Sequence, residues 1–246
     1  MHKISIITAT LNSEATIGDC LASIHDQSIE VEHLIIDGGS TDSTLDIVKS
    51  YPHVATIVSE PDSGIYDAMN KGIKLATGDV IGILNSDDFY AGLDTLEKVA
   101  QVLSQVGIDS CYGDLVYFDP ADTARIVRKW KSGYYHDRRF HWGWMPPHPT
   151  FFVRRSVYEK YGAFRLTLGS AADYELMLRL LVKCRITTSY IPEVLVRMRA
   201  GGVSNVSLKN RLMANRMDRL AWEVNGLRPY PWTTYLKPLS KVIQFL

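Results

Sequence analysis

The chain is poor in the residues and patterns that mark several large classes of protein. Its 246 residues include only three cysteines, Cys20, Cys111 and Cys184, and no CxxC spacing. An odd, scattered set argues against a disulfide framework or a zinc site and favours a reducing compartment. Lys plus Arg equals Asp plus Glu at 27 each, without the basic excess typical of nucleic-acid-binding proteins. We therefore expect no nucleic acid among its partners.

Long apolar runs are also missing. None reaches the roughly 20 residues of a membrane-spanning helix. The apolar stretch within the opening MHKISIITATLN is too short for a signal peptide and has no cleavage-site pattern, so we expect a cytoplasmic protein. There is no internal repeat and no low-complexity segment. With 46% hydrophobic and 22% charged residues, the composition indicates a globular chain with a substantial core.

The first half of the chain alternates strand and helix patterns. The predicted strands are residues 3–9, 33–36, 54–58 and 79–84, and the predicted helices are residues 13–27, 44–50, 65–76 and 93–103. This β-α-β-α order predicts an α/β fold, with a mostly parallel sheet and helices on both faces.

The second half is less regular. Strands are predicted at residues 110–118, 126–131, 186–190 and 194–199, helices at 155–161, 173–182 and 208–225, and a long loop at 134–150.

Polar residues follow each predicted strand of the first half. These exits are residues 8–12, 37–42, 60–64 and 85–88, and three of the four contain carboxylates. In open parallel sheets, ligands bind outside the carboxyl ends of the strands. We therefore expect the functional site along this edge.

Two adjacent acids, Asp87 and Asp88, stand where the fourth strand ends. A hard divalent cation such as Mg²⁺ or Mn²⁺ prefers oxygen ligands and would remove the repulsion between them. Taken alone, Asn85-Ser86-Asp87-Asp88 is better explained as a solvated turn. The metal site therefore depends on the neighbouring motifs.

Two further segments allow both a functional and a structural interpretation. In EPDSGIYDAMNKG, Asp62 or Ser63 can cap a helix, which leaves Asn70 unexplained inside the helical pattern. Asp173 is either a general base at the mouth of a cleft or part of a capping box in which Ser170 is the cap. Asp37 with its two following glycines fits either a ligand-binding turn or an Asx-turn before a helix capped by residue 40 or 41.

These motifs occur in an order that resembles the family 2 glycosyltransferases, which have the GT-A fold. The resemblance covers roughly residues 3–200 and is closest to bacterial enzymes that build surface polysaccharides. The matching segments are TATLN (8–12), DGGSTD (37–42), EPDSGIYDAMNKG (60–72), ATGD (76–79), LNSDD (84–88), YGD (112–114), HPTFFVR (148–154) and AADYELMLR (171–179).

The resemblance implies an inverting transfer of a sugar from a nucleotide-diphosphate sugar, expected to be UDP-linked, to a hydroxyl of a saccharide or lipid-linked saccharide. It implies Asp173 as the base, and Mn²⁺ or Mg²⁺ held by Asp87 and Asp88. His148 is expected beside the acceptor or as a further metal ligand, although a plain loop histidine explains it equally well, and Glu175 is expected beside the acceptor. Donor contacts are implied for Thr8, Ala9, Asn12, Asp37, Asp62, Lys71, Asn85, Ser86 and Asp114.

The chain departs from the family pattern at three positions. Gly38 replaces the second acid of a pair, which puts the UDP preference in doubt. Asn85 replaces the first acid of the DxD pattern, and Ala172 precedes Asp173 where the family often has Glu. Because Asp87 and Asp173 are intact, we expect catalysis.

Two other functions compete with this one. A non-catalytic module that binds a nucleotide sugar or a partner can use the same fold, but it would not need both Asp87 and Asp173. A sugar nucleotidyltransferase would need a glycine-rich, basic loop after the first strand, and TATLNSEAT contains no glycine.

We expect a catalytic domain over residues 1–205, with a nucleotide-binding half to about 115 and an acceptor half from about 116, followed by a tail at 206–246. The tail contains seven Lys or Arg against two acids, interleaved with aromatics. Such a segment suits an anionic membrane surface, which would place the protein at the inner face of the cell membrane. Packing on the catalytic domain or on a second subunit explains the tail equally well.

Overall fold

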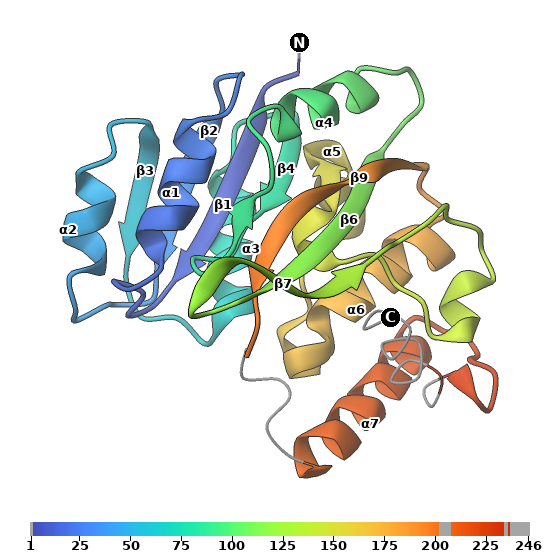
Figure 1. Ribbon diagram of the computed structural model, residues 1–246. Helices are drawn as coiled ribbons and strands as arrows, with labels where there is room; N and C mark the ends of the chain where they lie inside the picture. The colour runs from blue at the N-terminus through green and yellow to red at the C-terminus, as the bar shows by residue number, and fades with distance from the viewer. Residues whose placement is uncertain (1, 202–207, 234–235, 237–246) are drawn as a thin grey trace.

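A computed structural model of the chain describes residues 2–201, 208–233 and 236, with the backbone alone for 208–214 (Figure 1). The described strands form one sheet in the order β3-β2-β1-β4-β8-β6-β9-β5, with β7 beside β6. The strands are β1 (Ile4–Thr10), β2 (Glu32–Asp37), β3 (Val54–Ser59), β4 (Val80–Ile83), β5 (Phe89–Tyr90), β6 (Ser110–Asp119), β7 (Asp122–Trp130), β8 (Phe152–Arg154) and β9 (Thr188–Arg199).

The sheet is parallel in its first half and mixed in its second. Strands β1 to β4 run parallel to one another, and β6 runs parallel to β9. Strand β8 is antiparallel to both β4 and β6. Strand β7 is antiparallel to β6, and β5 is antiparallel to β9. The mostly parallel sheet expected for the nucleotide-binding half is therefore confirmed.

Helices cover both faces of this sheet, as expected (Figure 1). One face carries α1 (Ile17–His25), α2 (Thr44–Lys49) and α4 (Thr95–Leu103). The other carries α3 (Ile65–Leu75), α5 (Arg155–Tyr161), α6 (Ala172–Met177) and α7 (Leu208–Val224). The π-helix η4 (Leu178–Lys183) continues α6, and the short 3-10 helices are η1 (Arg139–Trp142), η2 (His148–Thr150) and η3 (Leu166–Ala171).

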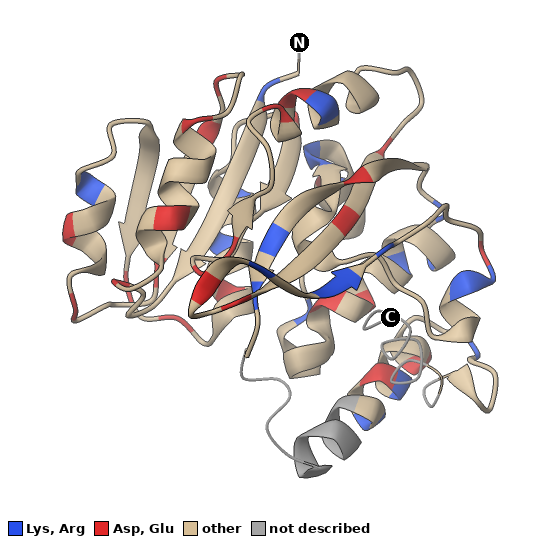
Figure 2. Cartoon of the chain, in the orientation of Figure 1, with Lys and Arg blue, Asp and Glu red and all other residues tan. Residues whose placement is uncertain are grey.

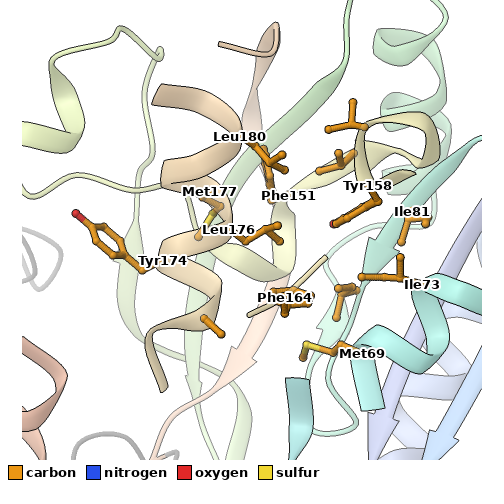
Figure 3. Packing of buried hydrophobic residues seen from close by; sticks show 14 of the residues in the cluster. Met69, Ile73, Ile81, Phe151, Tyr158, Phe164, Tyr174, Leu176, Met177 and Leu180 are labelled. Carbon is orange, nitrogen blue, oxygen red and sulfur yellow. The ribbon is translucent and has the colours of Figure 1, made fainter. Parts of the chain in front are cut away.

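The largest core cluster packs α3 and α6 against each other and against the sheet. Figure 3 shows Phe164 between Met69 and Ile73 of α3 and Leu176 of α6. Helix α3 also lies very close to β1, because a Cβ at Gly72 would be 2.4 Å from Cγ2 of Ile7. A larger residue there would push the helix off the sheet.

Several predicted elements differ from the observed ones. The two late strands are one, β9, and the predicted loop at 134–150 contains η1 and η2. The short strands β5 and β8 were not predicted. The N-cap residues also differ from those expected: α6 has Ala171 rather than Ser170, α2 has Ser43 rather than residue 40 or 41, and α3 has Gly64, at φ 115°, rather than residue 62 or 63. None of these three has a side-chain cap bond at its N-cap residue.

The described part of the predicted tail packs on the rest of the chain. Trp222 of α7 is fully buried, and its Nε1 donates to the hydroxyl of Tyr174 at 2.8 Å. Thr233 is buried too, and its hydroxyl donates to the carbonyl of His141. The rest of the predicted tail lies outside the described residues. Among the described helices, none is long and apolar enough to span a bilayer.

Candidate active site

The strand exits of the first half are joined side by side. The backbone N–H of Asn12 donates to Ser40 Oγ at 2.8 Å, and Oδ1 of Asn12 accepts from the N–H of Thr41 at 2.9 Å. The hydroxyls of Ser13 and Ser86 are 2.9 Å apart. The exits of β1, β2 and β4 therefore form one surface, and Figure 2 shows acidic residues gathered along that edge of the sheet.

The two acids after β4 are placed differently. Asp88 is fully buried, and accepts from Nδ2 of Asn85 at 3.1 Å and from the backbone N–H of Arg199 at 3.3 Å. Burial, with the charge of Asp87 beside it, raises the pKa of Asp88 well above its usual range. Asp87 itself is half-buried.

This arrangement fits a hard divalent cation. Oδ1 of Asn85 is buried and has no hydrogen-bond partner within the described chain. This oxygen is therefore available as a metal ligand beside the two carboxylates. Within the described residues, no three His, Cys, Asp or Glu side chains are placed to hold a metal. That matches Mg²⁺-type sites in which one or two carboxylates act together with substrate phosphates.

Asp37 holds the loop that follows β2. Its buried carboxylate accepts from the backbone N–H groups of Gly39 and Ser40 and from the hydroxyl of Ser59. Asp62 lies against the same loop, since a Cβ at Gly38 would be 2.7 Å from Oδ2 of Asp62. In this structure the carboxylate of Asp62 therefore occupies the space into which an acid at position 38 would project.

Lys71, expected near the donor phosphates, points to the segment that follows β3. Its Nζ is 2.8 Å from a carboxylate oxygen of Glu60 and donates to the carbonyl of Pro61 at 3.1 Å. Its side chain is largely shielded from solvent. The ammonium group of Lys71 is thus held at the exit of β3, next to Asp62.

Thr8 and Ala9 have their side chains in the protein interior. The hydroxyl of Thr8 lies 3.0 Å from Nε2 of His33, and Ala9 belongs to the largest core cluster. Direct contact between either side chain and a nucleoside does not fit this placement, because both are closed off from solvent.

Asp173 and His148 line one small cavity. It has a volume of about 10 Å³, and Phe164 and Tyr158 are among its other lining residues. Oδ1 of Asp173 accepts the backbone N–H of Tyr174 at 2.7 Å. Nε2 of His148 is buried without a hydrogen-bond partner among the described residues. Burial lowers the pKa of His148, while the charge of Asp173 opposes this shift.

Asp114, expected beside the donor sugar, is half-buried on β6. Its Oδ1 accepts from the backbone N–H of Ser132 at 2.7 Å and from the hydroxyl of Tyr190 at 2.8 Å. The carboxylate thus ties together the segments that flank β6.

Glu175 does not fit the expected contact with an acceptor. It is fully buried, and its carboxylate pairs with Arg179 at 2.9 Å and accepts from Nδ2 of Asn225 at 3.0 Å. Arg165 lies 3.4 Å from the same oxygen. The carboxylate therefore connects α6 to α7 and to η3, facing away from the cavity that Asp173 lines.

Three site residues were missed from the sequence. Burial raises the pKa of Tyr117 of β6. The charges of Asp88 and Asp173 raise it further, while Arg128 opposes the shift. Arg128 of β7 stacks on the ring of Tyr117 at 4.5 Å. Tyr66 of α3 lies against Asp173, and only its place inside the EPDSGIYDAMNKG motif could have pointed to it.

The chain is similar in sequence to several known proteins. The family described as "Glycosyl transferase family 2" matches residues 5–162. A PGL/p-HBAD biosynthesis glycosyltransferase of Mycobacterium tuberculosis is 34% identical over 207 residues, covering 82% of this chain and 78% of that protein. The glycosyltransferase YwdF of Bacillus subtilis, itself uncharacterized, is 25% identical over 235 residues, covering 93% and 86%.

Solved structures share the fold. TarS residues 1–349 of S. aureus, in complex with UDP-GlcNAc, superposes with a TM-score of 0.70 at 20% identity, covering 95% of this chain and 69% of that one. The mannosyltransferase PcManGT of Pyrobaculum calidifontis, in complex with GDP-Man and Mn²⁺, gives 0.67 at 18% identity, covering 96% and 68%. The GT-A-type fold is thereby confirmed, and the chain belongs to glycosyl transferase family 2.

Proposed function

We propose that this glycosyltransferase moves a sugar, with inversion, from a nucleotide-diphosphate sugar to an acceptor hydroxyl. The observation that supports this best is the placement of two sets of acids. The Asp87–Asp88 pair follows β4, Asp173 lies in the first turn of α6, and Ile83, at the end of β4, lines the same cavity as Asp173. One group of acids can thus serve the leaving diphosphate and another the attacking hydroxyl.

The donor half of the proposal uses the joined strand exits. Asp37, Asp62 and the loop between them would receive the nucleoside, with Asn12 and Ser86 at its border. Both donors seen in structural neighbours are nucleotide sugars, UDP-GlcNAc in TarS and GDP-Man in PcManGT. We propose a UDP-linked donor for this chain.

Asp87, Asp88 and the free amide oxygen of Asn85 would hold a divalent cation together with the donor phosphates. When bound, Mn²⁺ or Mg²⁺ supplies Lewis-acid stabilisation of the departing diphosphate. Asn85 contributes an oxygen without a charge, so the protein part of this site carries one negative charge less than the family pattern.

The acceptor half depends on Asp173. Its carboxylate, half-buried at the cavity, takes the proton of the acceptor hydroxyl as the oxygen attacks. His148 is held neutral by burial, so its unpaired Nε2 can hydrogen-bond to the acceptor and orient it. Orientation of this kind supplies a large part of the barrier reduction in bimolecular transfers.

We further propose that the acceptor is a saccharide or lipid-linked saccharide, reached at the cytoplasmic face of a membrane. An exposed aromatic cluster supports this. Trp142 and Trp232 are 54% and 46% exposed, their rings lie 6.2 Å apart, and Tyr230 is 5.3 Å from Trp232. Trp and Tyr favour the boundary between headgroups and acyl chains.

The base assignment is tested by Asp173→Asn. We expect release of UDP from UDP-GlcNAc, or of GDP from GDP-mannose, to fall by about 10²- to 10⁴-fold, because no group remains to take the proton. Nucleotide affinity, measured by calorimetry, should change less than twofold. The matched control is Asp46→Asn, at an exposed position of α2. Turnover retained in Asp173→Asn would reject the role.

A further inference from the structure

Asn70 of α3 makes a paired hydrogen bond with a backbone segment far away in the sequence. Its Nδ2 donates to the carbonyl of Phe164, and its Oδ1 accepts from the N–H of Phe164, both at 2.9 Å. The side-chain amide thus satisfies the donor and the acceptor of one residue, as a neighbouring strand would. Phe164 lies two residues before η3, and η3 leads directly into α6.

A second contact lies one helical turn earlier on the same face of α3. Tyr66 precedes Asn70 by four residues, so both side chains project in the same direction. The ring of Tyr66 is 5.2 Å from that of Phe164. Burial, and then the charge of Asp173, raise the pKa of Tyr66, and Phe164 and Asp173 line the same cavity.

We propose that Tyr66 and Asn70 are positioning residues that hold Asp173 in register with the donor-binding loop. Helix α3 begins directly after the exit of β3, where Asp62 accepts the N–H of Gly64 at 2.8 Å. Lys71, next to Asn70, is tied to Glu60 in the same exit. One rigid helix therefore touches the donor side at its start and fixes the segment that carries the base.

The capping bond expected at the start of α6 is absent, which gives this contact more weight. The N-cap residue is Ala171, and no side-chain cap bond is present there. Gly169, two residues earlier, lies at φ 50°, in the left-handed region that favours glycine. The segment from Phe164 to Asp173 therefore depends on contacts with other elements, and Tyr66 and Asn70 of α3 supply them at Phe164.

Hydrogen exchange tests the contact without any substrate. In Asn70→Ala the amide of Phe164 loses its acceptor, so we expect exchange there and across residues 164–173 to speed up by about tenfold or more, as for the loss of one buried hydrogen bond. Lys74→Ala, at an exposed position of the same helix, should leave these rates unchanged. Unchanged rates in Asn70→Ala would overturn the proposal.

Turnover tests the positioning role, which rests on the proposed function of Asp173. With UDP-GlcNAc and GDP-mannose as donors, Tyr66→Phe and Asn70→Ala should each lower kcat about tenfold with KM within twofold. A misplaced base slows the chemical step but does not weaken substrate binding.

Controls separate this proposal from the proposed function. Tyr51→Phe removes a hydroxyl that donates to the carbonyl of Gly18, far from Asp173, and should leave kcat unchanged. An unchanged kcat in Tyr66→Phe would reject positioning by Tyr66. Full turnover in Asp173→Asn would instead reject the base itself, and the exchange rates would then decide alone whether α3 fixes the segment.

Discussion

At the scale of single residues, the acid that the family pattern has at position 38 is replaced in space by another carboxylate. The carboxylate of Asp62 lies where a side chain at position 38 would project. The fold thus keeps an acid beside Asp37, but from the exit of β3 instead of β2. A sequence pattern that counts residues along one strand cannot find such a replacement, because it depends on two strands meeting.

Gly38→Ala should weaken nucleotide binding. The new Cβ would lie 2.7 Å from Oδ2 of Asp62, so Asp62 must move and lose its bond to the N–H of Gly64. We expect a loss of UDP affinity of about threefold to tenfold, the value of one hydrogen bond, with little change in stability because the displaced atom ends a flexible side chain. Calorimetric titration measures the affinity.

The control is Gly18→Ala, where nothing lies within 4 Å of the added Cβ. That substitution should leave UDP affinity unchanged. Equal affinity in Gly38→Ala and the unsubstituted protein would show that Asp62 does not contact the donor.

The placement of residues could be predicted from the sequence at the exits of β2 and β4, but not on the helix that carries Asp173. Glu175 follows Asp173 by only two residues, which turns it by about 200° around the axis. It therefore lies on the opposite face, paired with Arg179. Asn70 stood out in the sequence, but its partner, Phe164, is 94 residues away. Such a contact has no signal in local spacing.

At the scale of elements, long apolar strands and helices were predicted well and short or interrupted ones were not. Pro192 divided the predicted late strands, yet β9 runs through it. The register against β6 shifts there, from Tyr112 opposite Tyr190 to Asp114 opposite Val194. The bulge leaves a proline, which has no N–H, outside the ladder.

A histidine cluster joins α1, β2 and the start of β3. Nδ1 of the fully buried His33 is 3.1 Å from Nε2 of His53, and the ring of His53 is 5.0 Å from that of His25. Burial, and then the charge of His53, lower the pKa of His33 to about 3. The unfolded chain, with a value near 6.5, then binds more protons than the folded one.

Stability should therefore be full above about pH 6.5 and fall as the pH drops towards 3, by about 1.4 kcal/mol per pH unit for this one group. The free energy of unfolding in urea at pH 7.5, 6.0 and 5.0 measures the slope. His33→Gln should lower the slope by that amount, whereas His136→Gln, at an exposed residue, should not. Parallel slopes in all three proteins would exclude His33 as the source.

At the scale of the whole molecule, the described part of the predicted tail contributes to the largest core cluster. Trp222 lies in the same cluster as residues of α3 and α6, so truncation at residue 206 would remove core packing. Large aromatic deletions of this kind cost about 3–5 kcal/mol. Membrane contact must therefore be tested by substitutions on the surface of the intact chain.

Trp142→Ser with Trp232→Ser should reduce binding to vesicles. The pair is exposed and in contact, and its loss removes the apolar part of an interfacial anchor. Co-sedimentation with vesicles containing about 30% phosphatidylserine, a charge density that attracts basic segments, should fall several-fold. Val106→Ser, at a fully exposed residue, is the control. Equal pelleting of all three proteins would remove membrane contact through this cluster.

The most direct test of the central claim is calorimetric binding of UDP with Mn²⁺ and then with EDTA, on the unsubstituted protein, Asp87→Asn and Asp173→Asn. The proposed site predicts metal-dependent binding that Asp87→Asn weakens about tenfold or more, since a ligand charge at the cation is lost. Asp173→Asn should bind almost as the unsubstituted protein does. A UDP affinity that changes neither with EDTA nor in Asp87→Asn would contradict the account.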